Sequence, residues 1–190
     1  MAADVLTEEQ LMAAYVQGDR RAFQVLFAQL GPRVHAFFKR CFREPGVADD
    51  LFQTTFMKLH RSRNDYQSGR PLRPWLFAIA ARVRLDELRR RYRLPAETTE
   101  DALETLDTVP SPNPRADDAI ERQDRATWMQ TVLSALPESL RAVVVLHHYE
   151  GMTFGEIATV LGTTEGAARI RAFRAYERIR EGLGGMEGTA

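Results

Sequence analysis

Residues 152–180 read MTFGEIATVLGTTEGAARIRAFRAYERIR, a pattern that predicts two helices joined by a short turn. Thr153 and Glu156 have the three-residue spacing of a capping box, in which two side chains satisfy backbone N–H groups at the start of a helix. Gly162 follows the last apolar residue of the first helix and can adopt the left-handed conformation that ends it. Either of the two threonines that follow can cap the second helix. The stretch therefore predicts a helix-turn-helix, a motif that commonly places its second helix on DNA.

The second helix of this motif carries small residues on one side and basic residues on the other. Its core side has four residues at helical spacing, namely Ala168, Ala172, Ala175 and Ile179. Five arginines and two acidic residues lie between Thr163 and Arg180, which gives a basic surface suited to phosphates and to guanine edges in a major groove. A solvated amphipathic helix would also be charged on one side. The two caps and the glycine turn favour DNA binding over that alternative.

Composition favours an all-α protein of two small domains. The chain has 190 residues, of which 44% are apolar, so each of two domains can bury a core. Alternating runs of β-branched residues, which would predict strands, are lacking. The longest apolar stretches are too short to span a membrane, and the first residues lack the apolar core of a signal peptide. We therefore expect a cytoplasmic protein.

The zero net charge of the chain conceals three segments of different charge. Residues 1–94 hold 17 basic and 10 acidic side chains, a net charge of +7. Residues 95–124 hold 2 and 9, a net charge of −7, and contain four of the nine prolines. Residues 125–190 hold 7 of each sign. The middle segment is too polar to bury enough surface for a fold of its own, so we expect a flexible acidic linker between domains 1–94 and 125–190.

The front domain shows the caps and the apolar spacing of four helices. Thr7 and Gln10 form a second capping-box pattern, and Asp19 can cap the helix that follows. A third helix is expected from about residue 47 to residue 60, with acidic and polar residues on its outer face. A basic loop then leads to a helix that starts at Pro74, since proline is favoured in a first helical turn. These patterns predict a compact helical domain.

In this order the pieces resemble the extracytoplasmic-function (ECF) group of the sigma-70 family of bacterial transcription initiation factors. DDLFQTTF (residues 49–56) is similar to the region-2 helix of that family, which docks on the clamp helices of RNA polymerase. Residues 66–82 are similar to the loop and helix that recognise the minus-ten promoter element. LPESLR (residues 136–141) and the helix-turn-helix are similar to region 4, which reads the minus-35 element. The resemblance covers nearly the whole chain.

The resemblance implies three sets of site residues. Polymerase binding is expected at Asp49, Asp50, Gln53, Thr54 and Met57. Minus-ten DNA binding is expected at Arg61, Arg63, Tyr66, Ser68, Gly69, Arg70, Arg73, Arg82 and Arg89. Minus-35 DNA binding is expected at Thr164, Gly166, Ala167, Arg169, Ile170, Arg171, Phe173 and Arg174. Because Ala167 and Ile170 have no side-chain donor, upstream recognition is expected to depend more on Arg169, on Arg174 and on apolar contact with thymine methyl groups.

The function that the resemblance implies is that of a sigma factor, which binds the RNA polymerase core through its beta and beta-prime subunits, directs it to promoter DNA and helps to melt that DNA. An anti-sigma factor is an expected partner and could hold the protein near the membrane. The acidic linker is expected either to mimic nucleic acid inside the polymerase or to serve as a spacer. No small-molecule substrate, cofactor, metal or catalytic activity is expected, since the chain lacks a phosphate-binding glycine loop, a nucleophile motif and metal-ligand spacing.

Two other functions are compatible with parts of the pattern. A stand-alone helix-turn-helix regulator would bind duplex DNA by itself, usually as a dimer, with the front domain as a sensor. A helical adaptor would bind only other proteins. The chain shows no ligand-binding fingerprint for a sensor, and the basic side of the helix-turn-helix argues against a pure adaptor. We therefore favour the sigma-factor interpretation.

Overall fold

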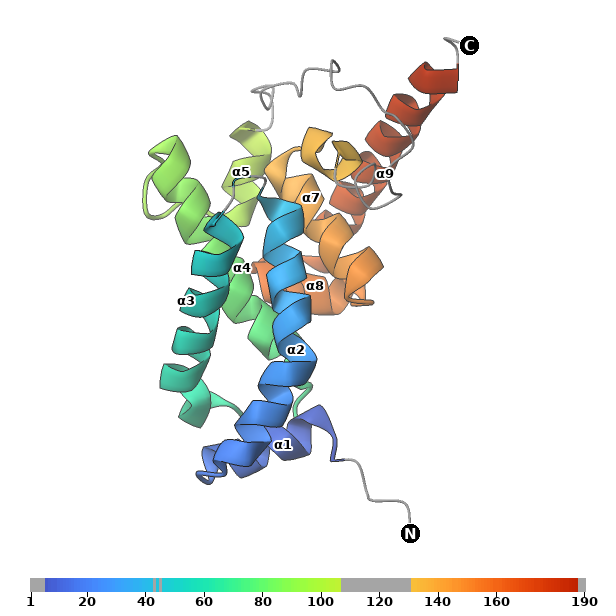
Figure 1. Cartoon of the computed structure of the whole chain (residues 1–190). Coiled ribbons are helices and arrows are strands. Elements are labelled where there is room, and N and C mark those ends of the chain that lie inside the picture. Colours follow the sequence, from blue (N-terminus) through green and yellow to red (C-terminus); the bar gives the residue numbers. More distant parts are fainter. Residues whose placement is uncertain (1–5, 43, 45, 107–130, 188–190) are drawn as a thin grey trace.

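The structure is a computed structural model that describes residues 6–42, 44, 46–106 and 131–187. All regular structure in these ranges is helical, which confirms the predicted all-α class (Figure 1). Within the same ranges, no helix combines the length and the apolar character that crossing a membrane would require.

The front half consists of four α-helices and one short 3-10 helix. In chain order these are α1 (Glu8–Val16), α2 (Arg20–Cys41), α3 (Val47–Ser62), η1 (Arg63–Asp65) and α4 (Leu72–Tyr92). α2 packs between α1 and α3, and α3 packs on α4. The third helix therefore lies at the edge of the front half, where its outer face is open to solvent (Figure 1).

Local capping explains where the first two helices begin. The Thr7 N–H donates to Gln10 Oε1 (2.8 Å) and the Gln10 N–H donates to Thr7 Oγ1 (3.2 Å), which confirms the predicted capping box. At the start of α2 the Asp19 carboxylate accepts a hydrogen bond from the Arg21 N–H (2.8 Å). Both caps lie within three residues of the groups that they satisfy, and for this reason the sequence alone could locate them.

α4 begins two residues earlier than predicted. The sequence pattern placed its start at Pro74, whereas in the structure the helix starts at Leu72. The Leu72 N–H donates to Glu9 Oε1 (3.2 Å), so a carboxylate from α1 satisfies an N–H group of the first turn of α4. The two residues are 63 positions apart, and no local pattern could have indicated this cap.

The rear half contains the predicted helix-turn-helix. After helical residues 131–135, the rear half continues with α7 (Glu138–Val144), the π-helical turn η2 (Val145–Tyr149), α8 (Phe154–Leu161) and α9 (Glu165–Glu187), and the last two form the motif. The Thr153 N–H donates to Glu156 Oε2 (2.8 Å), and Gly162 has a φ of 68°, which confirms both the capping box and the glycine turn. α9 continues past the predicted end at Arg180.

Three small residues let α9 pack closely on its neighbours. Ala168, Ala172 and Ala175 are almost completely buried, as their spacing predicted, and α9 contacts both α7 and α8. Ile170 and Phe173 lie on the other side of the helix and are exposed. The second helix of the motif is thus fixed by its alanine side and presents a mixed apolar and basic side to solvent.

The first part of the expected linker differs from the prediction. Residues 100–106 form a short helix, α5 (Glu100–Leu106), in which Glu100 and Leu103 are each only 3% exposed. The Glu100 carboxylate can be buried because Arg84 of α4 donates to both of its oxygens, at 2.5 and 2.6 Å. The remainder of the segment, residues 107–124, lies outside the described residues.

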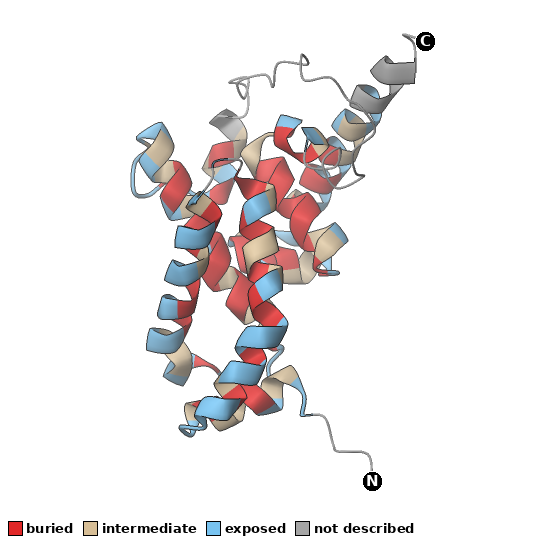
Figure 2. Cartoon of the chain, viewed as in Figure 1, coloured by how far each residue is buried: buried red, intermediate tan, exposed pale blue. Residues whose placement is uncertain are grey.

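The two halves are packed against each other around a shared core. α4 packs along α8, and α2 touches both α7 and η2. Arg33 Nε of α2 lies 2.8 Å from Glu150 Oε2, and Arg141 Nη1 of α7 donates to the Cys41 carbonyl (2.6 Å). Figure 2 shows the buried residues concentrated where these helices meet. The structure therefore holds the front and rear halves in a closed arrangement.

Cys41 should react with iodoacetamide only when the protein unfolds. Its side chain is 1% exposed, and burial raises the pKa of its thiol to about 12, so the reactive thiolate is scarce at pH 8. We expect alkylation of the folded protein at least about 100-fold slower than alkylation in concentrated guanidinium chloride. Mass spectrometry of timed samples measures both rates. Equal rates in the two conditions would contradict the burial of this thiol.

Candidate nucleic-acid and protein interfaces

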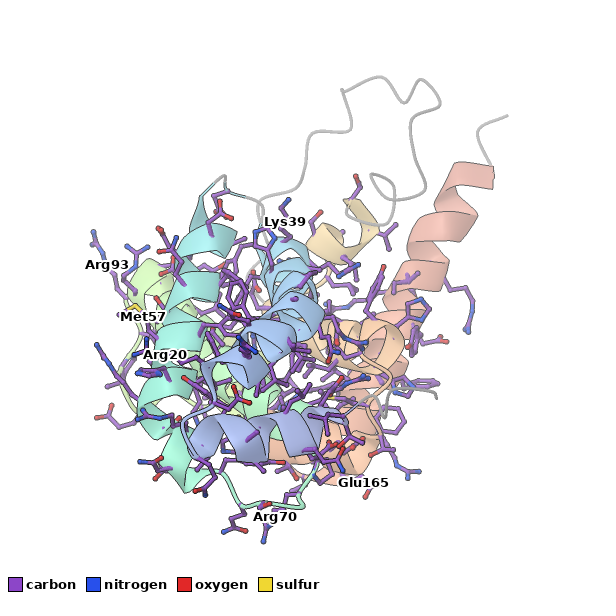
Figure 3. The ribbon with its side chains drawn as sticks, turned by 60° about the horizontal axis from the view of Figure 1, so that its bottom comes forward. Arg20, Lys39, Met57, Arg70, Arg93 and Glu165 are labelled. Carbon is purple, nitrogen blue, oxygen red and sulfur yellow. The ribbon has the colours of Figure 1, made fainter. Side chains whose placement is uncertain are left out.

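The outer face of α3 presents the predicted polymerase-binding residues to solvent. Those residues are Asp49, Asp50, Gln53, Thr54 and Met57, and each of them is exposed. Asp49 Oδ1 lies 2.7 Å from His35 Nε2 of α2, whereas the Met57 side chain projects away from the helix (Figure 3). Met57 is 55% exposed, although its thioether side chain is apolar. The structure therefore brings all five residues to one accessible face, with an unusual apolar residue among them.

An aromatic groove adjoins this face of α3. It has a volume of about 590 Å³ and is lined by Phe23, Phe27, Phe52, Gln53, Phe56, Met57, His60 and Arg61. The Phe27 ring centroid lies 4.8 Å from that of Phe56 and 5.6 Å from that of Phe52, so side chains of α2 and α3 interdigitate along the groove. The groove joins predicted polymerase-binding residues of α3 to phenylalanines of α2 and α3.

Sequence reasoning missed the part that α2 plays in this groove. Phe23 and Phe27 have the four-residue spacing of a core stripe, and such stripes are usually buried completely. In the structure Phe27 is 40% exposed. A sequence signal for this groove exists: Phe52 and Phe56 on α3 repeat the four-residue spacing of Phe23 and Phe27 on α2. Two such aromatic pairs on neighbouring helices indicate an aromatic surface between them.

The loop before α4 contains the predicted base-capturing residues. Ser68, Gly69 and Arg70 are exposed, and Arg70 points outward from the tip of the loop (Figure 3). Tyr66 differs from them, because it is only 7% exposed and its ring lies 5.3 Å from the ring of Trp75. Its hydroxyl donates to the Arg70 carbonyl, and burial raises the pKa of that hydroxyl. In this conformation Tyr66 supports the loop instead of offering a free stacking surface.

The other predicted minus-ten arginines divide into exposed and paired groups. Arg61 and Arg82 are exposed and make no ion pair within the described residues. Arg73 donates to both carboxylate oxygens of Glu8 of α1 through three hydrogen bonds of 2.6, 2.9 and 3.0 Å, and this bonding raises the pKa of Arg73.

Arg63 and Arg89 make hydrogen bonds within the protein. Arg63 donates to the His60 carbonyl (2.7 Å), and Arg89 donates to Asp86 (2.8 Å) and to the Thr98 carbonyl. Both side chains are half-buried. Within the predicted minus-ten set, the exposed arginines without an ion pair in the described residues are therefore Arg61, Arg70 and Arg82, and these are available to phosphate.

The exposed side of α9 carries most of the predicted minus-35 residues. Thr164, Gly166, Arg169, Ile170, Phe173 and Arg174 are exposed, and Ala167 is half-buried. Phe173 is 66% exposed and Ile170 is 53% exposed. Arg169 donates to Glu165 (2.6 Å) one turn earlier on the same helix. Large apolar side chains beside arginines on an open helix face are suited to the thymine methyls and phosphates of a major groove.

Arg171 differs from the other predicted residues of α9. Its side chain is 1% exposed, and its Nη2 donates to Asp101 Oδ1 of α5 (2.6 Å). Its Nε donates to Glu104 Oε2 (3.2 Å), and the neighbouring Arg174 also pairs with Glu104. Arg171 lies three residues after the core residue Ala168, so helical geometry turns it toward the interior, where α5 supplies the opposite charges. It is not accessible to DNA in this conformation.

Comparison with known proteins places both halves of the chain in one family. The model of sigma-70 region 2 matches residues 26–94, and the model of sigma-70 region 4 matches residues 126–179. The chain is 36% identical over 176 residues to the RNA polymerase sigma factor CarQ of Myxococcus xanthus, with 93% of this chain and 97% of that protein covered. It is 29% identical over 184 residues to the RNA polymerase sigma-H factor of Pseudomonas aeruginosa, with 93% of each covered.

Solved structures agree with these matches. The structure of CnrH in complex with the cytosolic domain of CnrY has a TM-score of 0.67 and 25% identity, and the match covers 94% of this chain and 97% of that one. The sigma factor RpoE of Bartonella quintana, solved in complex with the anti-sigma factor NepR, has a TM-score of 0.64. At 23% identity over 85% of this chain and 96% of that one, the second likeness shows the fold alone.

An all-α front half, a helix-turn-helix rear half and an exposed basic and apolar second helix define a class of helical DNA-binding proteins. The family matches make this class specific. The chain belongs to the sigma-70 family, as an RNA polymerase sigma factor of the ECF type, which confirms the resemblance inferred from the sequence. Sigma factors are transcription initiation factors that bind RNA polymerase core and promoter DNA, and the stand-alone regulator is not favoured.

Proposed function

We propose that the outer face of α3, the loop before α4 and the exposed side of α9 each bind a different partner during promoter recognition. The outer face of α3 and the aromatic groove bind the beta and beta-prime subunits of the polymerase core. The loop before α4, with Arg61, Arg70 and Arg82, binds the minus-ten element, and the exposed side of α9 binds the minus-35 element. Residues 1–94 and 125–190 act as the two domains that carry these surfaces. The proposal is supported by the exposure of the five candidate residues on α3, of Arg61, Arg70 and Arg82, and of most candidate residues on α9.

A single observation carries the assignment of α9. Phe173 and Ile170 are among the most exposed large apolar side chains of the described residues, and Arg169 and Arg174 flank them on the same face. Exposing such a pair is unfavourable in water, so a partner that covers it is expected. A major groove offers thymine methyls to the apolar side chains and phosphates or guanine edges to the arginines.

Simultaneous binding of both promoter elements requires the two halves to separate. The elements are centred about 25 base pairs apart, which is about 85 Å at 3.4 Å per base pair. A compact chain of this length has a radius of gyration of about 16 Å, so its two DNA-binding surfaces lie much closer together than that. We therefore propose that the packing of α4 on α8 belongs to a closed state and is lost when the polymerase positions both halves on a promoter.

We further propose that an anti-sigma factor stabilises a closed state of this protein in the cytoplasm, where polymerase is found. Two structural relatives were solved with such partners: CnrH with the cytosolic domain of CnrY, and RpoE with the anti-sigma factor NepR. The protein itself acts by binding and has no catalytic activity of its own. Transcription with and without purified core polymerase, and a scan of the protein alone for hydrolase activity, test these statements.

Arg174→Ala should cost about 1–3 kcal/mol of discrimination at one base pair of the upstream element, if its guanidinium reads a base edge. The measurement is transcription in vitro from a promoter pool with purified core polymerase, followed by sequencing of the transcripts. The matched control is Arg178→Ala, which removes an exposed arginine from the same helix, outside the predicted set. Equal loss at every upstream sequence would identify Arg174 as a phosphate contact. Transcription that is unchanged at all promoters would refute the assignment of α9.

A further inference from the structure

The short acidic helix α5 is bonded to the helix-turn-helix through its side chains. Asp101 Oδ1 accepts hydrogen bonds from Arg171 Nη2 (2.6 Å) and from Thr163 Oγ1 (2.7 Å) in the turn between α8 and α9. These bonds lower the pKa of Asp101. Glu104 accepts from Arg171 Nε (3.2 Å) and from Arg174 Nη1. Two carboxylates of α5 thus bind two arginines and the turn of the motif.

These carboxylates stand in for the groups that DNA would offer. A guanidinium binds carboxylates and phosphates through the same planar array of N–H donors. Arg171 and Arg174 are therefore engaged by Asp101 and Glu104 in a way that excludes a phosphate from the same donors. Ile170 and Phe173 of α9 stay exposed. α5 therefore competes with DNA for Arg171 and Arg174 only and does not cover the apolar residues of the helix.

We propose that α5 is an intramolecular competitor of promoter DNA for α9, so that full binding of the upstream element requires α5 to leave Arg171 and Arg174. This inference rests on the proposed DNA-binding role of α9. It adds a regulatory contact within the chain. The contact is made by α5, which belongs to the acidic segment that was expected either to mimic nucleic acid or to serve as a spacer. In this proposal the carboxylates of α5 mimic DNA phosphates toward the helix-turn-helix of the same molecule.

The competitor is coupled to the packing of the two halves. Glu100, at the start of α5, receives two hydrogen bonds from the completely buried Arg84 of α4, and Arg84 Nη1 lies 3.8 Å from Glu138 Oε2 of α7. α5 is therefore held by the front half at one end and holds the helix-turn-helix along its acidic side. When the halves separate, α5 cannot keep both sets of bonds. If it stays with Arg84 of the front half, its carboxylates leave Arg171 and Arg174, so release of α9 should accompany opening.

Polar groups at this junction are not all satisfied. Three buried side-chain atoms have no hydrogen-bond partner in the part of the chain that the structure describes: Arg84 Nε, Glu138 Oε2 and Arg171 Nη1. Arg84 and Arg171 bind carboxylates of α5, and Glu138 of α7 lies beside Arg84. A buried polar atom without a protein partner weakens the state that contains it, which favours a junction that can open.

Glu104→Gln should increase the affinity of the full-length protein for a duplex carrying the upstream element by about three- to ten-fold. The apparent affinity is the intrinsic affinity multiplied by the fraction of molecules in which α5 has left α9, and the substitution raises that fraction. Fluorescence anisotropy of a labelled duplex measures this affinity without polymerase. Glu104 is chosen because its side chain is 27% exposed and an amide keeps its shape, so folding is retained. The matched control is Glu97→Gln, which removes one exposed negative charge of the same segment that makes no ion pair within the described residues. Equal affinities of the two variants would overturn the proposal.

A second measurement needs no substitution and separates the inference from its premise. In the wild-type protein, hydrogen exchange of the amides of residues 100–106 should become faster on addition of the duplex. If the duplex binds, and Arg174→Ala weakens that binding, but exchange in α5 is unchanged, competition by α5 is refuted while the role of α9 stands. If Arg174→Ala has no effect on binding, alone or combined with Glu104→Gln, the role of α9 fails and the inference fails with it.

Discussion

Arg84→Met should lower the free energy of unfolding by about 3–5 kcal/mol, the cost of removing one partner from a buried ion pair. Arg84 is 0% exposed and donates to both oxygens of Glu100, which is itself 3% exposed. Burial opposes the charge of Arg84 more than any other single cause, but the attractions of Glu100, Cys41 and Glu138 together with the hydrogen bonds to Glu100 outweigh it and raise the pKa of the guanidinium. Methionine fills a similar volume and leaves the Glu100 carboxylate buried without its counter-charge. Urea unfolding followed by circular dichroism measures the loss.

The control for this experiment is Arg82→Met. Arg82 lies on the same helix, is exposed, and makes no ion pair within the described residues, so its replacement should change the free energy of unfolding by less than about 0.5 kcal/mol. The Arg84→Met protein should also show faster amide exchange in residues 100–106, because α5 loses its anchor. Equal stability of the two variants would show that the Arg84 to Glu100 bonds do not hold the closed junction.

Met57→Asp should weaken the affinity for core polymerase by about 30-fold, which corresponds to about 2 kcal/mol, the range of an interface hot spot. Met57 is 55% exposed and belongs to the aromatic groove, which is suited to an apolar side chain of the partner. A carboxylate at this position would have to lose its hydration when the groove is covered. Because Met57 is already exposed in the free protein, its replacement should leave the fold intact.

Competition with a labelled reference sigma factor for purified core measures this affinity. The matched control is Val25→Asp, which introduces the same charge at a 42% exposed apolar residue of α2 that does not line the groove. Val25→Asp should bind core as the wild type does. Similar affinities of all three proteins would remove the groove from the polymerase interface, and weakening by both substitutions would indicate a nonspecific effect of charge.

The sequence predicted the exposed residues of the three candidate surfaces to different extents. The five polymerase-binding candidates on α3 are exposed together, because a helical period of 3.6 residues sorts an outer face from an inner one. The exposed residues of α9 follow from the same periodicity. The loop before α4 was identified by its composition, yet composition could not show that Tyr66 turns inward against Trp75. Burial of a single loop residue depends on which helix packs behind it.

The sequence by itself determined where α1, α2 and α8 begin and where the turn of the helix-turn-helix lies. Thr7, Asp19, Thr153 and Gly162 act on backbone groups within about four residues, so their effects do not depend on the rest of the fold.

Only the tertiary structure decided that α5 forms, that Arg171 is buried against it and that two phenylalanine pairs make a groove. Arg171 and Asp101 are 70 residues apart in the chain, as Leu72 and its cap Glu9 are 63 apart. A carboxylate beside a distant arginine becomes stable in the interior only after packing has removed water from both, and packing is a property of the whole chain.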